Sequence, residues 1–471
     1  MPKSIFDLVI VGHGAAGLTA AVAAAEAARE GGITADITVV ERAAEGAHGG
    51  NTRFTPCYMR LEAPDRLPAN FVDDMVAVSG GRNDRAYFET LATEAPATMG
   101  WLQSHGIAFH NPVYYLSVGP PRIQPLGGGE TIVRELTRAA REAGVGFRYG
   151  CEAASLVRDA TGAISGLNIS NANGAAETLL ADAVVLACGG FQGNADMLRQ
   201  HFGPGGEALQ PISPGTRLNT GGGIRMAMAV GALPAGDWNG MHAEPIDPRA
   251  KTPAAVVLVY PYGIVVDRTG KRFFDEGAGL VHETWEAFAR DIHFKAPGRI
   301  AYAILDHRLF EIENYARAIR SEVPPYQSET LAGLASLIDV PAEQLEATVA
   351  AYNRAAVGDP ARFNAGDRDG LAASPALYPP KSNWARALSK PPFVAYPLIG
   401  AIAYTFGGLA TDTSARVLGA GGKIRGLYAA GEITGHFHGT APNAVAVLRA
   451  AVFGRIAGQS AVKTARKSAH P

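Results

Sequence analysis

The stretch that most constrains the fold of this chain is its beginning. An apolar segment at 6–11 runs into a glycine-rich loop at 12–17, an alanine-rich segment follows at 15–29, and a second apolar segment at 36–40 ends on Glu41. The apolar segments predict buried parallel strands, and the alanine-rich segment between them predicts a helix. We therefore expect a strand, a tight glycine loop, a helix and a second strand, in that order.

Each glycine of this loop has a physical role in holding a dinucleotide. Gly12 permits the tight turn, Gly14 lets the backbone approach a pyrophosphate at the helix N-terminus, and Gly17 lets the helix pack closely on the strand. Glu41 would accept a hydrogen bond from the adenosine ribose. The stretch alone leaves NAD and FAD open. An ordinary glycine-rich turn in an α/β core is the alternative, because the chain contains 56 glycines.

Composition bounds the size of the fold and its partners. The chain has 471 residues, of which 47% are hydrophobic, so it can bury the cores of two or three domains. Its net charge is -2, and no basic stripe with interleaved aromatic residues occurs, so we expect no nucleic-acid partner. No run approaches the roughly 20 apolar residues of a membrane span. The apolar N-terminus is interrupted by His13 and glycines, so it does not indicate a targeting signal.

The cysteines indicate the redox compartment. Cys57, Cys151 and Cys188 are scattered and lack the spacing of metal ligands. We therefore expect no metal site, no cysteine-held iron–sulfur cluster and no disulfide framework. This usage is typical of a reducing, cytoplasmic compartment.

Beyond the first βαβ unit, the chain continues with loops and mixed elements. Loop 46–55 is dense in glycine and small hydroxyl residues and would wrap a second stretch of the cofactor, although such residues also gather in ordinary surface loops. Residues 66–105 predict an amphipathic helix, and residues 114–122 a short strand. A helix at 130–143 and a strand at 145–149 follow.

Composition changes along the chain predict a discontinuous domain. Residues 152–183 alternate and turn like a small antiparallel insertion, and 182–191 form an apolar strand that ends in small residues. From 236–375 the chain is richer in aromatic and charged residues and lacks long parallel-type strands, which predicts an inserted capping domain. The dinucleotide-binding domain would then consist of 1–235 and 376–471.

Two more segments return to the first domain. Residues 426–432 form another strand-like run that ends on an acid, Glu432, and residues 443–464 predict a final helix.

Eight segments, spread over nearly the whole chain, occur in an order and spacing typical of one enzyme family. They are the glycine loop with Glu41, Gly49-Gly50-Asn51-Thr52, 184–191, Asn219-Thr220-Gly221, Gly270-Lys271-Arg272-Phe273 with Glu276, Gly407-Gly408-Leu409, 427–432 and 452–458. Together they resemble the fumarate reductase and succinate dehydrogenase flavoprotein family. The resemblance implies an α/β fold: a Rossmann-like FAD-binding domain of the glutathione reductase type with an inserted α+β capping domain.

Five further segments point to one branch of that family. They are Gly50-Asn51-Thr52-Arg53, Ser79-Gly80-Gly81-Arg82, Leu126-Gly127-Gly128-Gly129, Lys381-Ser382-Asn383-Trp384-Ala385 and Pro391-Pro392-Phe393-Val394-Ala395-Tyr396-Pro397. These segments resemble the tricarballylate dehydrogenases. That resemblance implies an enzyme that removes two hydrogens from a saturated tricarboxylate to give an alkene.

The chain also departs from the family pattern. The arginine acid and the second substrate arginine of fumarate reductases fall on Leu280 and Pro442, and their histidine before the last glycine pair falls on Tyr404. We therefore do not expect fumarate reduction as the family performs it. The tyrosines that related ketosteroid dehydrogenases place at Leu280 and Ala441 are absent, which argues against a steroid. The histidine that attaches flavin covalently falls on Ala43, so we expect noncovalent FAD.

The resemblance also implies the residues that hold FAD. The glycine loop would meet the pyrophosphate, Glu41 the ribose, the loop after the second strand the phosphate or the flavin, and the start of the final helix the pyrimidine edge. The predicted cofactor residues are Gly12, Gly14, Ala15, Ala16, Gly17, Glu41, Arg42, Gly50, Asn51, Thr52, Ala187, Asn219, Glu432, Pro442, Ala446 and Val447.

Four residues are candidates for catalysis. Arginine and histidine are the natural carboxylate ligands, since guanidinium offers a bidentate fork and imidazole changes charge near neutral pH. His242 falls where the family places a substrate histidine, although it also fits a hydrogen-bonded core histidine. Arg122 could bind a carboxylate or lie on the surface. Tyr404 could donate a proton or simply pack, and His438 lies in a glycine loop that would close over the flavin.

Three functional hypotheses follow. The first is an FAD-dependent oxidoreductase that desaturates, or reduces, a C–C bond next to a carboxylate and exchanges electrons with a separate protein or quinone-linked acceptor. The second keeps the flavin but takes a less charged small-molecule substrate, which the missing arginines favour. The third is a catalytically idle flavin-binding protein.

Overall fold

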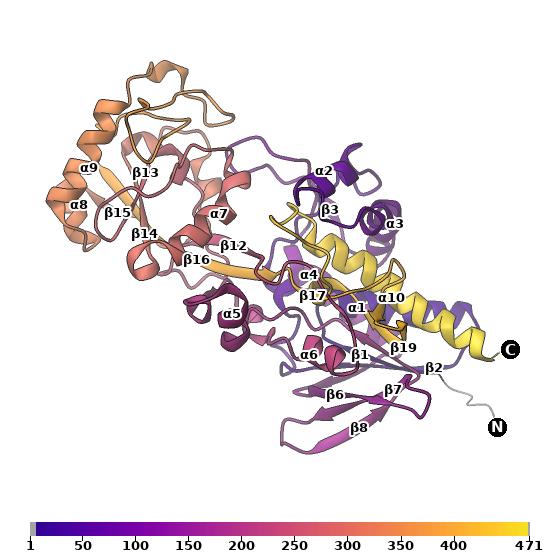
Figure 1. The fold of residues 1–471 in the computed structure, drawn as a ribbon. Helices are drawn as coiled ribbons and strands as arrows, with labels where there is room; N and C mark the ends of the chain where they lie inside the picture. The colour runs from indigo at the N-terminus through magenta and orange to yellow at the C-terminus, as the bar shows by residue number, and fades with distance from the viewer. Residues whose placement is uncertain (1–5, 470–471) are drawn as a thin grey trace.

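The computed structural model describes residues 6–469, and its first layered unit is built on a six-stranded sheet (Figure 1). The strand order is β18-β19-β9-β1-β2-β5, parallel except for β18. The strands are β1 (Phe6–Val11), β2 (Ala35–Glu41), β5 (Gly146–Tyr149), β9 (Ala183–Leu186), β18 (Arg416–Gly419) and β19 (Gly422–Ala429). Helix α1 (Ala15–Glu30) connects β1 to β2, so the structure contains the βαβ unit expected from the sequence.

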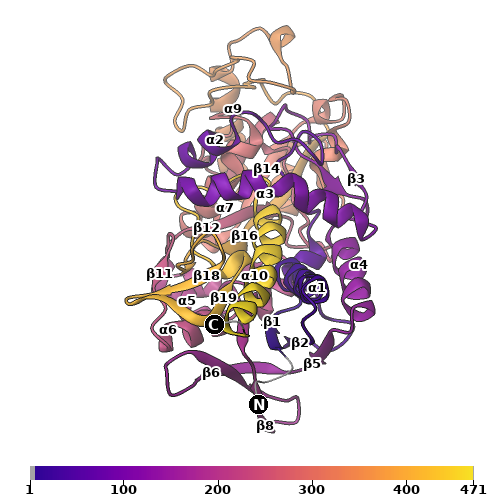
Figure 2. The same ribbon diagram turned by 90° about the vertical axis from the view of Figure 1, so that its right-hand side faces the viewer.

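Both faces of this sheet are covered, which explains its uninterrupted apolar strands. Leu8 and Ile10 pack with the helices of one face, whereas Val9 and Val11 pack with the elements of the other. Helices α1, α4 (Gly128–Glu142) and α10 (Ala446–Ala469) lie side by side on the first face (Figure 2). The second face carries the expected antiparallel insertion, formed by β6 (Glu152–Arg158), β7 (Ile164–Ser170) and β8 (Ala176–Leu180).

Small residues let α1 approach its neighbours at backbone distance. A Cβ at Gly17 would overlap the carbonyl oxygen of Gly12. On α10, a Cβ at Gly454 or Gly458 would overlap carbonyl oxygens of α1. The alanine-rich sequence of α1 therefore follows from packing on both sides, because larger side chains would push the two helices apart.

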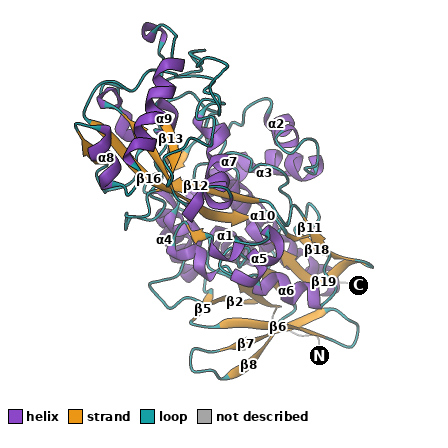
Figure 3. Cartoon of the chain, turned by 60° about the vertical axis from the view of Figure 1, so that its left-hand side comes forward, coloured by secondary structure: helices purple, strands orange, loops and turns teal. Residues whose placement is uncertain are grey.

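The second layered unit is a mixed sheet centred on one long strand, β16 (Phe393–Thr405). Its other strands are β10 (Gln210–Pro211), β12 (Met241–Ile246), β13 (Ile264–Asp267), β14 (Ala301–Leu305) and β15 (Tyr326–Ser328). Helix α7 (Val281–Phe294) covers one face, and α8 (Leu331–Leu337) with α9 (Ala342–Ala355) covers the other (Figure 3). Strand β16 pairs with β14 in its first half and with β12 in its second half. Its last residue reaches the first unit, where the backbone N–H of Thr405 donates to Glu432.

Further helices and short strands complete the fold. They are α2 (Phe71–Ala77), α3 (Arg85–Ser104), α5 (Ala195–Phe202), α6 (Gly222–Ala229), β3 (Phe109–His110), β4 (Gln124–Pro125), β11 (Pro234–Ala235) and β17 (Gly408–Leu409).

Two local predictions are wrong. Residues 66–105 form two helices, α2 and α3, because Gly80 and Gly81 adopt positive φ values of 65° and 86° that end the first helix. Residues 114–122 form no strand but an irregular loop, because Gly119 and the prolines after it do not support a ladder of hydrogen bonds.

Packing places residues 376–398 with the capping unit rather than with the first domain. Phe393 and Leu398 belong to its hydrophobic clusters. The buried ammonium group of Lys381 donates hydrogen bonds to the carbonyl oxygens of Pro261 and Gly263. We therefore propose that the capping domain extends from about residue 236 to about 398, beyond the boundary at 375 that the sequence suggests.

Within residues 6–469, no helix combines the length and the apolar composition that a membrane crossing needs.

The close approach of α1 to the glycine loop generates a stability prediction. Gly17→Ala should destabilise the fold by about 3 kcal/mol, since the added methyl group meets backbone rather than a flexible side chain. As a control, Gly100→Ala lies on the exposed face of α3 with open space around it, and should be neutral or stabilising by up to about 1 kcal/mol. Urea unfolding at constant m measures both. Equal stability of Gly17→Ala and the native chain would contradict the packing.

Candidate active site

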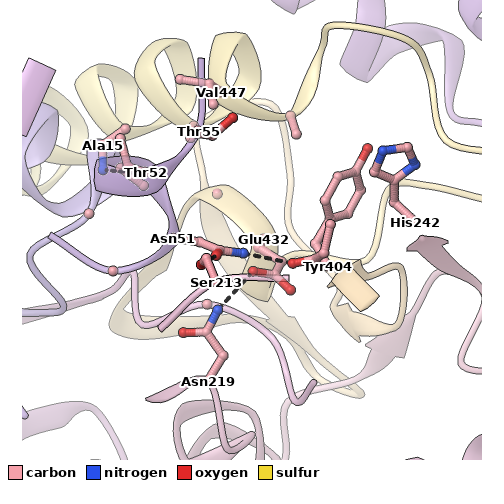
Figure 4. Close-up of a pocket in the computed structure, with 18 of the residues that line it drawn as sticks. Ala15, Asn51, Thr52, Thr55, Ser213, Asn219, His242, Tyr404, Glu432 and Val447 are labelled. Carbon is pink, nitrogen blue, oxygen red and sulfur yellow. Dashed lines mark hydrogen bonds between the residues drawn. The ribbon is translucent and has the colours of Figure 1, made fainter. Parts of the chain in front are cut away.

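One cavity runs from the glycine loop to the junction of the two units (Figure 4). In this view Ala15 and Thr52 lie toward one end, Tyr404 and His242 toward the other, and Glu432 between them. Fifteen of the predicted cofactor residues line the cavity: Gly12, Gly14, Ala15, Ala16, Glu41, Arg42, Gly50, Asn51, Thr52, Ala187, Asn219, Glu432, Pro442, Ala446 and Val447.

Gly17 is the predicted cofactor residue that does not line the cavity. It lies one turn into α1, where its missing side chain makes room for the carbonyl group of Gly12. Its contribution is to bring the helix N-terminus up to the loop.

The glycine loop and Glu41 form the outer end of the cavity. The buried Glu41 carboxylate accepts hydrogen bonds from the backbone N–H groups of His13 (2.9 Å) and Ala43 (2.7 Å). Burial raises the pKa of Glu41, and the two backbone hydrogen bonds oppose that rise. The carboxylate is thus fixed at the end of β2, directly beside the loop that leads into α1. This is the arrangement that a ribose hydroxyl pair requires.

The middle of the cavity is a network of amide, hydroxyl and carboxylate groups. Asn51 donates to the carbonyl oxygen of Ala403 (2.7 Å) and accepts from the hydroxyl of Ser213 (2.7 Å). Glu432 accepts from the backbone N–H of Thr405 (3.0 Å) and from the amide of Asn219 (3.2 Å). Burial raises the pKa of Glu432. These contacts lock the polar wall between the two ends.

The cavity fits FAD because two helix N-termini lie on its wall. It passes the N-termini of two helices: α1, whose N-cap Gly14 offers no side-chain hydrogen bond, and α10, whose first residues Ala446 and Val447 line the wall. Helix N-termini attract negative charge. The diphosphate of FAD would lie at α1, Glu41 would hold the ribose, and the polar wall with the start of α10 would hold the flavin end.

Arg122 lies in the part of the cavity beyond this wall and is 4% exposed. Its guanidinium group is stacked between the rings of Tyr58 and Tyr114, 3.8 Å from each ring centroid. Among the described residues, its Nε and Nη2 atoms have no hydrogen-bond partner, and no carboxylate forms an ion pair with it. A buried cation without a counter-ion is costly, so this site favours an anionic ligand.

His242 lies between two carboxylates in the same part of the cavity. Its Nδ1 atom is 2.7 Å from Oε2 of Glu286, and its Nε2 atom is 3.2 Å from Oε1 of Glu244. Desolvation lowers the pKa of His242, but the hydrogen bonds and charges of the two glutamates outweigh it and raise the pKa to about 9. His242 is therefore a cation at neutral pH.

Tyr404 lies opposite His242 in the pairing of β16 with β12, and the two ring centroids are 4.9 Å apart. Burial raises the pKa of Tyr404 well above its usual value, and the charges of Glu286 and Glu244 add to this effect. Tyr404 is therefore a neutral hydroxyl group that faces the cavity beside a protonated imidazole.

His438 does not reach the cavity. Its Nδ1 atom lies 3.1 Å from the amide oxygen of Asn83, outside the residues that line the site. The glycine loop that carries it does contribute to the wall, but through Thr440, Ala441 and Pro442. The structure thus brings Arg122, His242 and Tyr404 together and leaves His438 apart.

Several residues of the site were not found from the sequence. Glu244 follows His242 by two positions on a strand, and this period-2 spacing was a usable signal. Glu286 comes from α7, 44 positions from His242, and no local pattern connects the two. Further missed wall residues include Tyr58, Tyr115, His282, Trp285, Arg320 and Arg449.

The comparisons with known proteins agree with this geometry. The family described as FAD binding domain matches residues 7–445, so the chain belongs to it. A probable fumarate reductase of Shewanella frigidimarina is 28% identical and covers 98% of this chain and 76% of its own length. An NADH:acrylate oxidoreductase of Vibrio harveyi is 30% identical and covers 79% of this chain and 36% of its own length.

Solved structures show the same fold. The open conformation of a flavocytochrome c3 fumarate reductase has a TM-score of 0.78 and 26% identity, covering 98% of this chain and 79% of that chain. The chain is an FAD-dependent oxidoreductase of the fumarate reductase and succinate dehydrogenase flavoprotein family, whose reactions fall on CH–CH groups. The predictions of the family, the α/β fold and FAD are confirmed.

The two glutamates around His242 raise its pKa, and this shift can be measured. Because the folded pKa of about 9 exceeds the ordinary value of 6.5, protonated His242 stabilises the fold fully below pH 6.5, and this stabilisation is lost as the pH rises through about 9. A ¹⁵N NMR titration of histidine side chains should give a midpoint near 9, and Glu286→Gln should lower it. The control Asp291→Asn, on the same helix but paired with Lys295, should leave it unchanged. A midpoint at or below 6.5 in the native chain contradicts the proposed charge state.

Proposed function

We propose that this chain adds or removes hydrogen across a C–C bond next to a carboxylate, and that Arg122 binds that carboxylate. The observation that carries the proposal is the buried guanidinium of Arg122, which lines the cavity and lacks a counter-ion among the described residues. Its aromatic neighbours hold its plane in place, so a carboxylate could meet its edge without reorganisation of the site.

The residues around Arg122 supply the remaining requirements of the reaction. Bound FAD supplies the exchange of two electrons. Arg122 stabilises negative charge that develops on the carboxylate when hydrogen leaves or joins the neighbouring carbon. In the direction of reduction, Tyr404 donates the proton to the substrate carbon, because its hydroxyl is protonated at physiological pH. In the direction of desaturation, the deprotonated oxygen of Tyr404 would take up the proton that leaves the carbon. The cationic His242 beside it stabilises the tyrosinate that forms when the hydroxyl gives up its proton.

Two classes of substrate are candidates. Tricarballylate is the first, from the sequence segments and because the cavity wall contains a second guanidinium, that of Arg320, with no ion pair among the described residues. A less charged carboxylate is the second. Two glutamates, Glu244 and Glu286, flank His242, and Leu280 and Pro442 stand at the positions of the two fumarate reductase arginines and add no positive charge. The alternative to both is a catalytically idle flavin-binding protein, whose flavin no substrate would bleach.

Electron exchange with a second molecule belongs to the same proposal. Within residues 6–469, no group of three or more His, Cys, Asp or Glu side chains is arranged to hold a metal ion. The electrons would therefore pass between FAD and a separate protein or quinone-linked acceptor. Noncovalent FAD and a cytoplasmic location remain predictions of the sequence, the former because Ala43 offers no nucleophile.

The role of Arg122 predicts a specific kinetic loss. Anaerobic addition of tricarballylate, succinate and a panel of monocarboxylates and neutral analogues to the FAD-loaded protein should bleach the flavin absorbance with at least one carboxylate. Arg122→Met should raise the KM for that carboxylate about 10- to 100-fold, because a charge-assisted hydrogen bond of roughly 1.5–3 kcal/mol is lost.

The control is another stacked arginine. Arg386 lies over the ring of Phe363 and has an unpaired Nε, but it is outside the cavity, so Arg386→Met should keep the native KM. Bleaching by neutral compounds alone would contradict the carboxylate proposal, and bleaching by no member of the panel would favour the idle protein.

The proton-transfer role of Tyr404 predicts a loss in kcat. Tyr404→Phe should lower kcat by about 10²–10⁴-fold with little change in bound FAD, because the substitution removes only the hydroxyl. Tyr396→Phe, on the same strand but away from the cavity, is the matched control and should retain native kcat. A native rate in Tyr404→Phe would assign the proton transfer to another residue.

A further inference from the structure

The cavity wall holds a second buried arginine, Arg449, in the first turn of α10. This side chain is 1% exposed and belongs to the cavity wall. Its Nη1 atom donates to the carbonyl oxygen of Thr434 (3.2 Å), and its guanidinium lies 3.8 Å from the ring centroid of Phe437. Its Nε and Nη2 atoms have no hydrogen-bond partner among the described residues.

Arg449 has no direct counter-ion among the described residues. Among the described residues, no carboxylate lies within ion-pair distance of its guanidinium. Burial raises the pKa of Glu432 and of Tyr87, and burial together with the charge of Arg449 lowers the pKa of His436 to about 3. The charge of Arg449 lowers the pKa of Glu432, so the two groups interact, although they form no ion pair. A guanidinium is therefore buried in the wall of the site without a direct counter-ion, which costs free energy unless a bound group supplies negative charge.

The course of the cavity indicates which group that is. With the diphosphate at α1 and the adenosine at Glu41, the flavin end of the cofactor would lie on the other side of the polar wall, where α10 begins. The N-terminus of α10 carries partial positive charge of its own. Arg449 and this helix end thus act on the same end of the cofactor.

We infer that Arg449 is a positioning residue that sets the redox potential of the flavin by stabilising its reduced, anionic form. Oxidised flavin that takes up two electrons and one proton, at N5, becomes an anion with its charge spread over N1, C2 and O2. A nearby fixed cation favours that anion over the neutral form, which needs a second proton. Loss of the cation should therefore lower the midpoint potential.

Potentiometry of the FAD-loaded protein tests the inference, and it needs no substrate, so its outcome is independent of the proposed reaction. At a fixed potential, Arg449→Gln should lower the ratio of reduced to oxidised flavin 10- to 100-fold, which is about 30–60 mV at 29.6 mV per factor of ten. Arg449→Lys should recover most of the native value, because it restores the charge. Arg455→Gln, on the same helix but outside the cavity wall, should keep the native potential. An unchanged potential in folded, FAD-loaded Arg449→Gln overturns the inference.

A second measurement uses the native chain and so does not depend on the folding of a variant. If the reduced flavin remains anionic, the midpoint potential should fall by about 30 mV per pH unit between pH 5 and pH 7, since one proton accompanies two electrons. Glu432, Tyr87, His436, Tyr404 and Arg449 are the ionisable groups nearest this end of the cavity, and the raised and lowered pKa values given above keep His436 and the two tyrosines neutral in this range. A slope of about 60 mV per pH unit, which indicates two protons, would overturn the inference.

Discussion

The structure depends on one close contact, the backbone approach between α1 and the glycine loop. Gly12 turns with a φ of 108°, and Gly17 leaves no side chain between the helix and that turn. On its other side α1 meets α10 through Gly454 and Gly458. These contacts fix the N-terminus of α1 at one end of the cavity. They also fix the position of α10, whose own N-terminus faces the same cavity.

The second organising element is β16, which runs through the second unit and ends against Glu432 of the first. Its first half pairs with β14 and β15, and its last residues pair with β12. Tyr404 lies near the end of this strand, directly opposite His242. The proposed catalytic pair is therefore assembled on neighbouring strands at the junction, while Arg122 is supplied by a loop of the first domain.

Charge is distributed unevenly along the cavity. Arg122 and Arg449 are buried without counter-ions among the described residues, whereas His242 is surrounded by two glutamates. We propose that the two arginines act as receptors for negative charge, one for a substrate carboxylate and one for the flavin. His242 has its counter-ions already in place, so its charge serves the neighbouring Tyr404. This division of roles follows from partners and burial, and residue type alone does not show it.

Short sequence patterns predicted the elements whose structure depends on neighbouring residues. The first βαβ unit and the antiparallel insertion follow from glycine spacing, apolar runs and alternation, and the structure contains them. The cofactor residues implied by the family resemblance stay a prediction, and fifteen of them line one cavity. The break at Gly80 and Gly81 was missed because the apolar periodicity continues across it. His438 was assigned to the site from its loop, yet the loop enters the wall through residues 440–442. The contact of Glu286 with His242 joins α7 to β12, and only the tertiary fold creates it.

The central claim is that one cavity holds FAD along its length and a carboxylate at Arg122. A crystal structure of the FAD-loaded protein with the carboxylate that bleaches its flavin tests this claim directly. The account predicts the adenosine ribose on Glu41, the flavin ring at the start of α10, and carboxylate oxygens within hydrogen-bond distance of the Arg122 guanidinium. A carboxylate bound elsewhere, with Arg122 in contact with protein groups alone, would contradict it.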